Sequence, residues 1–139
     1  MHKGPLLASE DFLWGEDLFN HGYYWEAHEA WEGPWQIAEG NNKLFLKGLI
    51  LLSASGVKVR EGKREAALRH ANRAAEVFLL ISKRAQLELA RAIGMTPSGA
   101  AMMSITAIEA AFKRNAHSLV PQAVFPFVLG KTGEVAAEV

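Results

Sequence analysis

The stretch LFLKGLILLSASGVKV, residues 44–59, constrains the fold more than any other part of the chain. Its side chains are apolar almost all round, and a helix of that kind has to be enclosed by other elements. About fourteen residues precede Lys58 in this stretch, whereas a bilayer crossing needs about twenty. We therefore expect a buried central helix over about Lys43–Arg60 and no insertion into a membrane. Small residues along it would let neighbouring helices approach closely: Gly48, Ser55 and Gly56.

Helical periodicity continues towards the N-terminus. Ser9 can cap a first helix that runs to about Asn20. A second helix begins near Tyr24 and is expected to weaken at Gly33–Pro34, because a proline inside a helix loses a hydrogen bond and clashes with the preceding turn. The residues that follow, EGNN at 39–42, are predicted to form a loop.

The second half of the chain continues the helical pattern. A fourth helix begins near Arg64, and its inward side is expected to carry Ala67, Leu68, Ala71, Ala75, Phe78 and Leu79. Ser82 can cap a new helix, so the sequence leaves open whether the fourth helix ends there or continues to Ile93, where Gly94 stops it. Thr96–Pro97 predicts the start of the last helix, with threonine as the cap and proline in the first turn.

Glycine turns at Gly22 and Gly62 would each join two consecutive helices into a hairpin. We therefore predict an all-α fold in which two antiparallel helical hairpins and a C-terminal helix form a single domain over residues 1–139. The two turns are forty residues apart, which faintly resembles the helix pairs of tetratricopeptide repeats.

The tail over residues 120–139 contains two prolines and is expected to be irregular. Several of its side chains are too apolar to remain in water: Val124, Phe125, Phe127, Val128 and Leu129. They should pack on the body of the domain or on a second copy of the chain. The second possibility predicts a homodimer through the tail.

Charge is balanced overall but not along the chain. Lys plus Arg and Asp plus Glu both number 15, and a neutral chain is a poor nucleic-acid binder because phosphate contacts need an excess of basic side chains. Residues 1–41 nevertheless hold eight acidic residues and one lysine, whereas residues 42–91 hold eleven basic and four acidic residues. We expect an acidic face to meet a basic face inside the domain.

Cysteine is absent from the sequence, which excludes disulfides and cysteine-bound zinc and fits a reducing compartment. The N-terminal residues have too short an apolar run for a signal peptide. A cytoplasmic location is therefore expected.

The run GYYWEAHEAWEGPW, residues 22–35, combines many aromatic and acidic side chains. A helix turns about 100° per residue. On that wheel one sector, predicted to face the core, comprises Tyr24, Ala27, Trp31 and Trp35. The adjacent sector comprises Trp25, His28, Glu29 and Glu32. This second sector is the candidate functional site, because an imidazole and two carboxylates share it.

One interpretation of this sector is metal chemistry. HEAWE, residues 28–32, differs by one residue from the H-E-x-x-H of zinc proteases. His28 and Glu32 would ligate one ion, and Glu29 would act as the base of a metal-assisted hydrolase. The second histidine is missing, and a third ligand would have to come from His21 or His70, neither of which the sequence places there. No metal or other cofactor is therefore expected, and the hydrolase is kept as the alternative function.

Two other interpretations are a pocket and a structural lock. Tryptophans around a few polar groups are typical of clefts that bind a small molecule or a peptide. Buried carboxylates need partners, and if the hairpins pack side by side, Glu29 and Glu32 would meet the fourth helix and lock the hairpins together. The partners would be Arg69, His70 or Arg73. A lock of this kind can also line a cleft.

We therefore predict a binding or scaffold domain and not, in the first place, an enzyme, since no serine elbow or phosphate-binding glycine loop is present. The predicted ligand-binding residues are Trp25, His28, Glu29, Glu32, Trp35, Arg69, His70 and Arg73.

Three blocks of the sequence resemble a known family. The first is YYWEAHEAWEGPW, the second is LKGLI in the apolar helix, and the third is the Gly62 turn followed by Ala67 and Leu68. Together, over about residues 12–80, they resemble the domain of unknown function 309 family. The resemblance implies a compact all-helical fold found in small microbial proteins, and it brings no activity with it. Lys47 stands where members of that family have a glutamine in the apolar helix.

Overall fold

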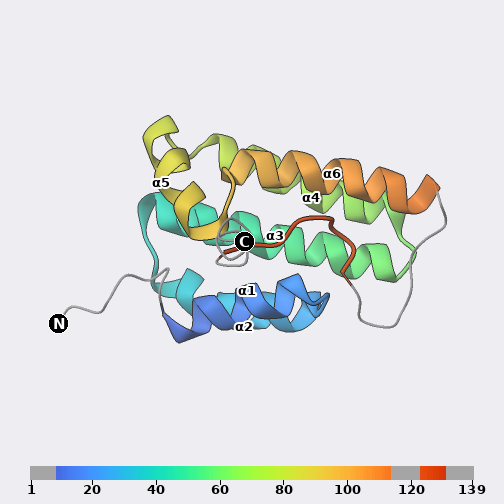
Figure 1. Cartoon of the computed structure of the whole chain (residues 1–139), viewed down its shortest axis with the longest axis horizontal. Coiled ribbons are helices and arrows are strands. Elements are labelled where there is room, and N and C mark those ends of the chain that lie inside the picture. The colour runs from blue at the N-terminus through green and yellow to red at the C-terminus, as the bar shows by residue number, and fades with distance from the viewer. Residues whose placement is uncertain (1–8, 114–122, 131–139) are drawn as a thin grey trace, which may run out of the picture.

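The computed structural model describes residues 9–113 and 123–130. The described residues form six helices and no strand: α1 Glu10–Asn20, α2 Tyr24–Ile37, α3 Gly40–Arg60, α4 Arg64–Leu79, α5 Lys83–Ile93 and α6 Pro97–Lys113. The predicted all-α class is confirmed. Two hairpins, α1–α2 and α3–α4, are followed by the short α5 and the longer α6 (Figure 1).

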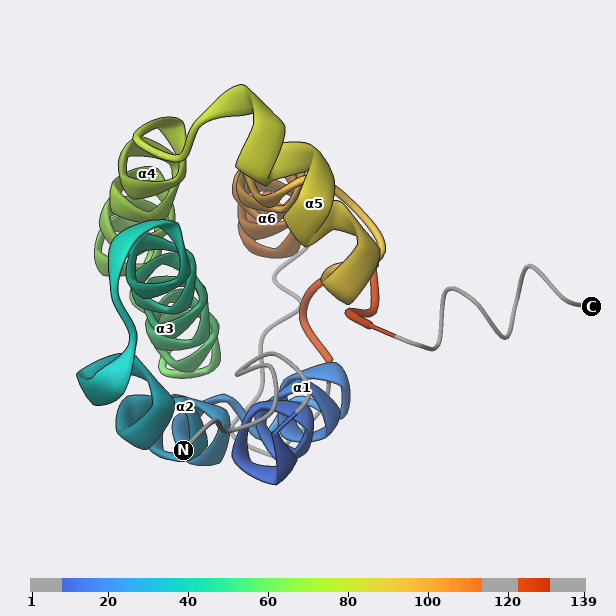
Figure 2. The same cartoon turned by 90° about the vertical axis from the view of Figure 1, so that its left-hand side faces the viewer.

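Helix α3 packs against α2 on one side and against α4 and α6 on the other. Viewed end on, it lies between the α1–α2 layer and the α4–α6 layer (Figure 2). Leu46, Leu49 and Leu52 on this helix are completely buried. The central position follows from the all-round apolarity of the helix, because any exposed side of it would leave leucines in water.

Two of the predicted close approaches along α3 are present. A Cβ atom added at Gly48 would overlap the ring of Phe78 from α4, and one added at Gly56 would lie 2.6 Å from Cγ of Tyr24 from α2. Both rings are fully buried. The two glycines thus fix how closely α4 and α2 approach the central helix, one from each side.

Two predictions around Pro34, the weakening of the second helix and the extent of the following loop, differ from the structure. Helix α2 continues through Pro34 to Ile37, and the expected loop at 39–42 shortens because α3 already begins at Gly40. The proline lies one turn before the end of the helix, and its ring is buried. Burial of the ring offsets the backbone hydrogen bond that proline cannot make.

The sequence left open whether the fourth helix ends near Ser82 or continues to Ile93, and in the structure it ends before Ser82. Helix α4 ends at Leu79, and the Ser82 hydroxyl accepts a hydrogen bond from the backbone N–H of Ala85 at 3.2 Å, which caps α5. The inward position predicted for Leu79 is wrong, because the chain leaves the helix there and the side chain is 74% exposed. Gly94 ends α5 in the left-handed conformation, as predicted.

The irregular segment over residues 123–130, the strap, contacts α1 and the start of α2, and it lies between α1 and α5 in Figure 2. The side-chain amide of Asn20 donates to the carbonyl of Leu129 at 3.0 Å and accepts from its N–H at 2.8 Å. The hydroxyl of Tyr24 accepts from the N–H of Val124 at 2.7 Å. The strap rings that lie against α1 and α2 belong to Phe125 and Phe127.

Residues 123–130 contain neither helix nor strand, while 120–122 and 131–139 of the predicted irregular tail lie outside the described residues. Phe125, Phe127 and Leu129 are buried as predicted, whereas Val128 is 37% exposed. These apolar side chains are covered by helices of the same chain. The homodimer through the tail stays a prediction.

Candidate functional site

The N-terminal half of α2 determines where the candidate site lies. Tyr24, Ala27 and Trp31 are completely buried, so the predicted core face of this helix is confirmed for these three residues, while Trp35 is partly buried. The guanidinium of Arg60, at the end of α3, donates to the carbonyl of Gly22 in the turn before α2. This bond ties the start of α2 to the end of α3 and places the neighbouring sector of α2 beside the C-terminal half of α3.

A hollow of about 270 Å³ opens where α2, α3 and α4 meet. Its lining residues come from all three helices and from the turn after α3: Trp25, His28, Ala54, Val57, Lys58, Glu61 and His70. Three of the predicted site residues, Trp25, His28 and His70, are therefore brought together in it. We call this hollow the two-histidine hollow.

Trp25 and His28 form one wall of the two-histidine hollow. Their rings are stacked, with centroids 5.3 Å apart and planes inclined by 21°. Trp25 is 56% exposed and covers the imidazole from outside. The Nδ1 atom of His28 is buried and has no hydrogen-bond partner among the described residues. A buried polar atom without a partner is costly, so this nitrogen has an unused hydrogen-bonding capacity beside the hollow.

Lys58 and Glu61 form the second wall. The Lys58 ammonium donates to the Glu61 carboxylate at 3.1 Å, and the Lys63 ammonium lies 3.4 Å from the same carboxylate oxygen. The hydrogen bond from Lys58, together with the charges of both lysines, lowers the pKa of Glu61. Two cations therefore share one anion at this edge of the hollow, and the local balance is positive.

His70 closes the hollow from α4. Its pKa is lowered, mainly because the side chain is partly buried and further because of the positive charges of Arg69, Lys58 and Arg73. The imidazole is thus held towards its neutral form in a positive environment. Arg69 and Arg73 themselves are exposed and do not line the hollow.

The predicted lock between the hairpins is wrong. Glu29 and Glu32 are exposed, and no ion pair between described residues joins either carboxylate to α4. Helix α2 packs mainly on α1 and α3. Because α3 separates α2 from α4, the two carboxylates on the outer side of α2 do not reach the basic side chains of α4.

Trp35 lies away from the two-histidine hollow, although it was predicted to share the site. Its ring is partly buried, and the ammonium groups of Lys43 and Lys47 lie 4.6 Å and 5.4 Å from its centroid. Lys47 thus packs its cation against an aromatic face of the second helix. Of the eight predicted ligand-binding residues, three line the hollow, two act on it through charge, and three lie outside.

The arrangement gives the alternative interpretation, a metal-assisted hydrolase, no support. Within residues 9–113 and 123–130, no group of three or more His, Asp or Glu side chains is placed to hold a metal ion. Glu32 does not line the hollow that His28 lines. A tetrahedral catalytic site needs three protein ligands around one ion.

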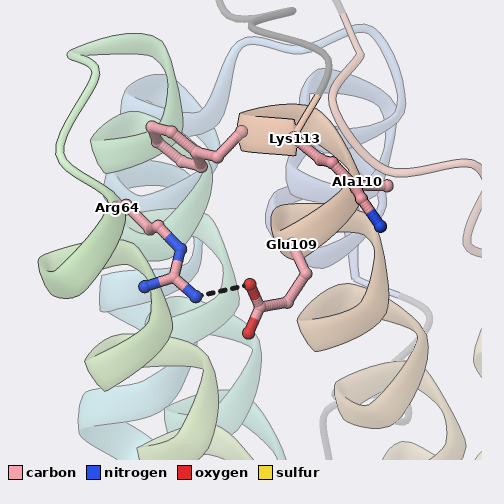
Figure 3. A pocket seen from close by; sticks show the side chains of 5 residues that line it. Arg64, Glu109, Ala110 and Lys113 are labelled. Atoms are coloured by element: carbon pink, nitrogen blue, oxygen red, sulfur yellow. Dashed lines mark hydrogen bonds and ion pairs between the residues drawn. The ribbon is translucent and has the colours of Figure 1, made fainter.

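A wider hollow of about 560 Å³ lies between α4 and α6, lined by Arg64, Glu109, Ala110, Phe112 and Lys113. In Figure 3 the Arg64 and Glu109 side chains face each other across it. The Arg64 guanidinium donates to the Glu109 carboxylate at 2.6 Å, with both side chains about half exposed. Because the two charged groups already form an ion pair with each other, this hollow is the weaker candidate for a ligand site.

Sequence reasoning missed the contribution of α3 to the site. Ala54, Val57, Lys58 and Glu61 line the hollow but were assigned to the core helix and to the turn. The spacing of Ala54, Lys58 and Glu61 at i, i+4 and i+7 places them on one side of the helix end. Lys58, a lysine near the end of an otherwise apolar helix, was the sequence signal that could have indicated a site there.

The fold and the two-histidine hollow define a small helical domain with one candidate binding site on its first four helices. Residues 12–70 match the family described as Domain of unknown function (DUF309), so this stretch of the chain is similar to that family. The predicted resemblance is thereby confirmed to residue 70, and all the residues that line the hollow fall within the matched stretch.

No match was found among curated proteins or among solved structures. None of the helices in the described part of the chain has both the length and the apolar character that a membrane crossing requires.

Proposed function

We propose that this domain is a binding module and that the two-histidine hollow takes a small anionic ligand, such as a phosphate or a carboxylate. The observation that carries the proposal is the convergence of Lys58, His28 and His70 on one small hollow. Each of these side chains can donate a hydrogen bond to an anion, and the lysine donates with a full positive charge.

The surroundings of the hollow favour an anion over a cation. The pKa of His70 is lowered partly by Arg69, Lys58 and Arg73, so the site already lies in the field of several positive charges. An anion placed there would be attracted by the same charges that disfavour protonation of His70. The one carboxylate at the edge, Glu61, already interacts with two lysines.

The size and the aromatic wall restrict the ligand further. A volume of about 270 Å³ lies just below the usual range for drug-sized ligands, about 300–1,000 Å³, so the ligand is expected to be small. The Trp25–His28 stack offers a flat apolar surface. A carboxylate on a small ring would place its ring near this wall and its charge near Lys58.

The proposal is tested by titrating the full chain with phosphate and with benzoate and following the NMR signals of the Trp25 indole and the histidine rings. Binding is expected to move the signals of Trp25, His28 and His70 together. Lys58→Met should weaken binding about tenfold or more, because it removes a charged hydrogen-bond donor. Lys63→Met is the matched control, since Lys63 interacts with the same carboxylate from outside the hollow.

Either of two results would reject the anion site. One is the absence of any shift with about 10 mM of each anion, a concentration that detects binding worth only about 3 kcal/mol. The other is an equal loss of affinity in Lys58→Met and Lys63→Met, which would indicate non-specific attraction to a basic surface.

A further inference from the structure

Helix α1 carries an exposed apolar surface with an acidic border. A shallow hollow of about 500 Å³ there is lined by Glu10, Asp11, Leu13, Trp14 and Asp17. Leu13 is 39% exposed and Trp14 is 56% exposed, although tryptophan is normally among the more buried residues. The spacing of Glu10, Leu13, Trp14 and Asp17 places them on one side of the helix. We call this surface the acidic face.

A second exposed apolar surface lies where α4 passes into α5, and its border is basic. Leu79, Leu80 and Leu87 are 74%, 69% and 68% exposed. Around them are the exposed basic side chains of Lys83, Arg84 and Arg91. Two acidic residues are close by: Glu88, at 4.0 Å from Arg84 with both side chains largely exposed, and Glu39, which lines a hollow together with Glu88. We call this surface the basic face.

The two faces carry the charge segregation seen in the sequence. From the uneven charge along the sequence we predicted that acidic residues of positions 1–41 meet basic residues of positions 42–91 inside the domain. Among the salt bridges between described residues, none joins these two segments. Asp17 interacts only weakly with His21, at 3.6 Å on the surface, and Arg84 only with Glu88. The charged side chains of the acidic face and of the basic face are thus directed towards solvent.

We propose that the acidic face of one copy binds the basic face of a second copy. Each face combines large apolar side chains with a border in which one charge sign predominates, so the pair is complementary in both respects. The chain as a whole has no net charge, so two copies do not repel each other through an overall charge.

The arrangement of the helices makes this contact head-to-tail. Helix α5 lies at the top of the molecule and α1 at the bottom in both views (Figures 1 and 2). A contact between two different faces is heterologous, and it continues to further copies unless the rotation closes a ring. We therefore expect the average mass to grow with protein concentration and to pass beyond that of a dimer.

The test measures sedimentation of the full chain over a range of concentrations, at low and at high salt. The wild-type chain should associate at low salt and less at high salt, because exposed charges are screened. Two charge-reversed variants are compared with it: Glu10→Lys with Asp17→Lys, and Lys83→Glu with Arg84→Glu. Each variant alone should associate about tenfold more weakly or not at all, since like charges then face each other.

Mixing the two variants provides the decisive arm. The first variant keeps a natural basic face and the second keeps a natural acidic face, so the mixture should associate again while each variant alone does not. A wild-type chain that stays monomeric at every concentration overturns the proposal. So does association that persists in both variants alone, or a mixture that behaves as the sum of its components.

Discussion

Single residues on the central helix fix how closely its neighbours approach. Gly48 has no room for a Cβ atom beside the Phe78 ring, and the ring is fully buried. Gly48→Ala should therefore lower the free energy of unfolding by about 1–3 kcal/mol, because it overpacks the core. Phe78→Leu costs stability alone but should make room for the added methyl group. Denaturant unfolding of the single and double variants should show that the two losses are not additive.

Gly33 is the matched control for that substitution, since nothing lies within 4 Å of a Cβ atom added there. Gly33→Ala should leave stability unchanged or raise it slightly, because alanine favours a helix over glycine. Equal losses at Gly33 and Gly48, or strictly additive losses at Gly48 and Phe78, would contradict the packing account.

Tyr24 gives a prediction at alkaline pH. Burial raises the pKa of its hydroxyl above the ordinary value of 10.0, and the hydrogen bond from the N–H of Val124 lowers it only in part. A raised pKa in the folded state means that stability is fully present below the ordinary value and is lost as the pH rises through the folded value. Wild-type stability should therefore fall more steeply above pH 10 than that of Tyr24→Phe.

Tyr23→Phe serves as the control for this experiment, because Tyr23 is 43% exposed. Its unfolding free energy should follow the wild-type curve at alkaline pH. At neutral pH Tyr24→Phe should be about 1–2 kcal/mol less stable than wild type, since the N–H of Val124 loses its acceptor. If Tyr23→Phe, and not Tyr24→Phe, flattened the alkaline limb, the assignment would be wrong.

At the scale of elements, the strap is the feature whose attachment is most open to test. Asn20→Ala removes both hydrogen bonds to Leu129 and should speed hydrogen exchange of the Leu129 amide. Asn20→Asp keeps the oxygen that accepts from this amide and loses only the donor to the carbonyl. It should retain more protection than Asn20→Ala. Identical exchange in the wild type and both variants would show that the side chain does not hold the strap.

The elements also show what local sequence signals can and cannot predict. The caps at Ser9 and Ser82 and the stop at Gly94 are local features, and the helices begin and end there. The continuation of α2 through Pro34 was not predictable in the same way. It depends on burial of the proline ring, which is a property of the packed domain.

The candidate site was predictable only in those features that depend on the geometry of a single helix. The helical wheel separated the buried Tyr24 and Trp31 from the sector of Trp25 and His28, because this separation depends only on helix geometry. The partners of Glu29 were predicted wrongly, because they depend on which helices are neighbours. Charge complementarity along the sequence does not reveal that α3 lies between α2 and α4.

At the scale of the whole molecule, the exposed charges and the two-histidine hollow account for different properties. The acidic and basic faces concern association between copies, whereas the hollow lies between α2, α3 and α4. Lys58→Met should therefore leave the sedimentation behaviour unchanged, and reversal of Lys83 and Arg84 should leave phosphate binding unchanged. Sedimentation and NMR titration of the same two variants test this independence. Coupled losses in both assays would contradict it.

His70 makes the central claim testable at acid pH. Its pKa is lowered in the folded chain, so the stability it contributes is present above the ordinary value of 6.5 and is lost as the pH falls through the folded value. An anion bound in the hollow would have the opposite effect, since it favours the protonated imidazole.

The most direct measurement is an NMR pH titration of the histidine rings with and without phosphate. The account predicts that phosphate raises the pKa of His70, while the ring signals of the exposed His21, outside the hollow, serve as the reference. The rise should disappear in Lys58→Met. A pKa of His70 that is the same with and without phosphate would contradict the anion site.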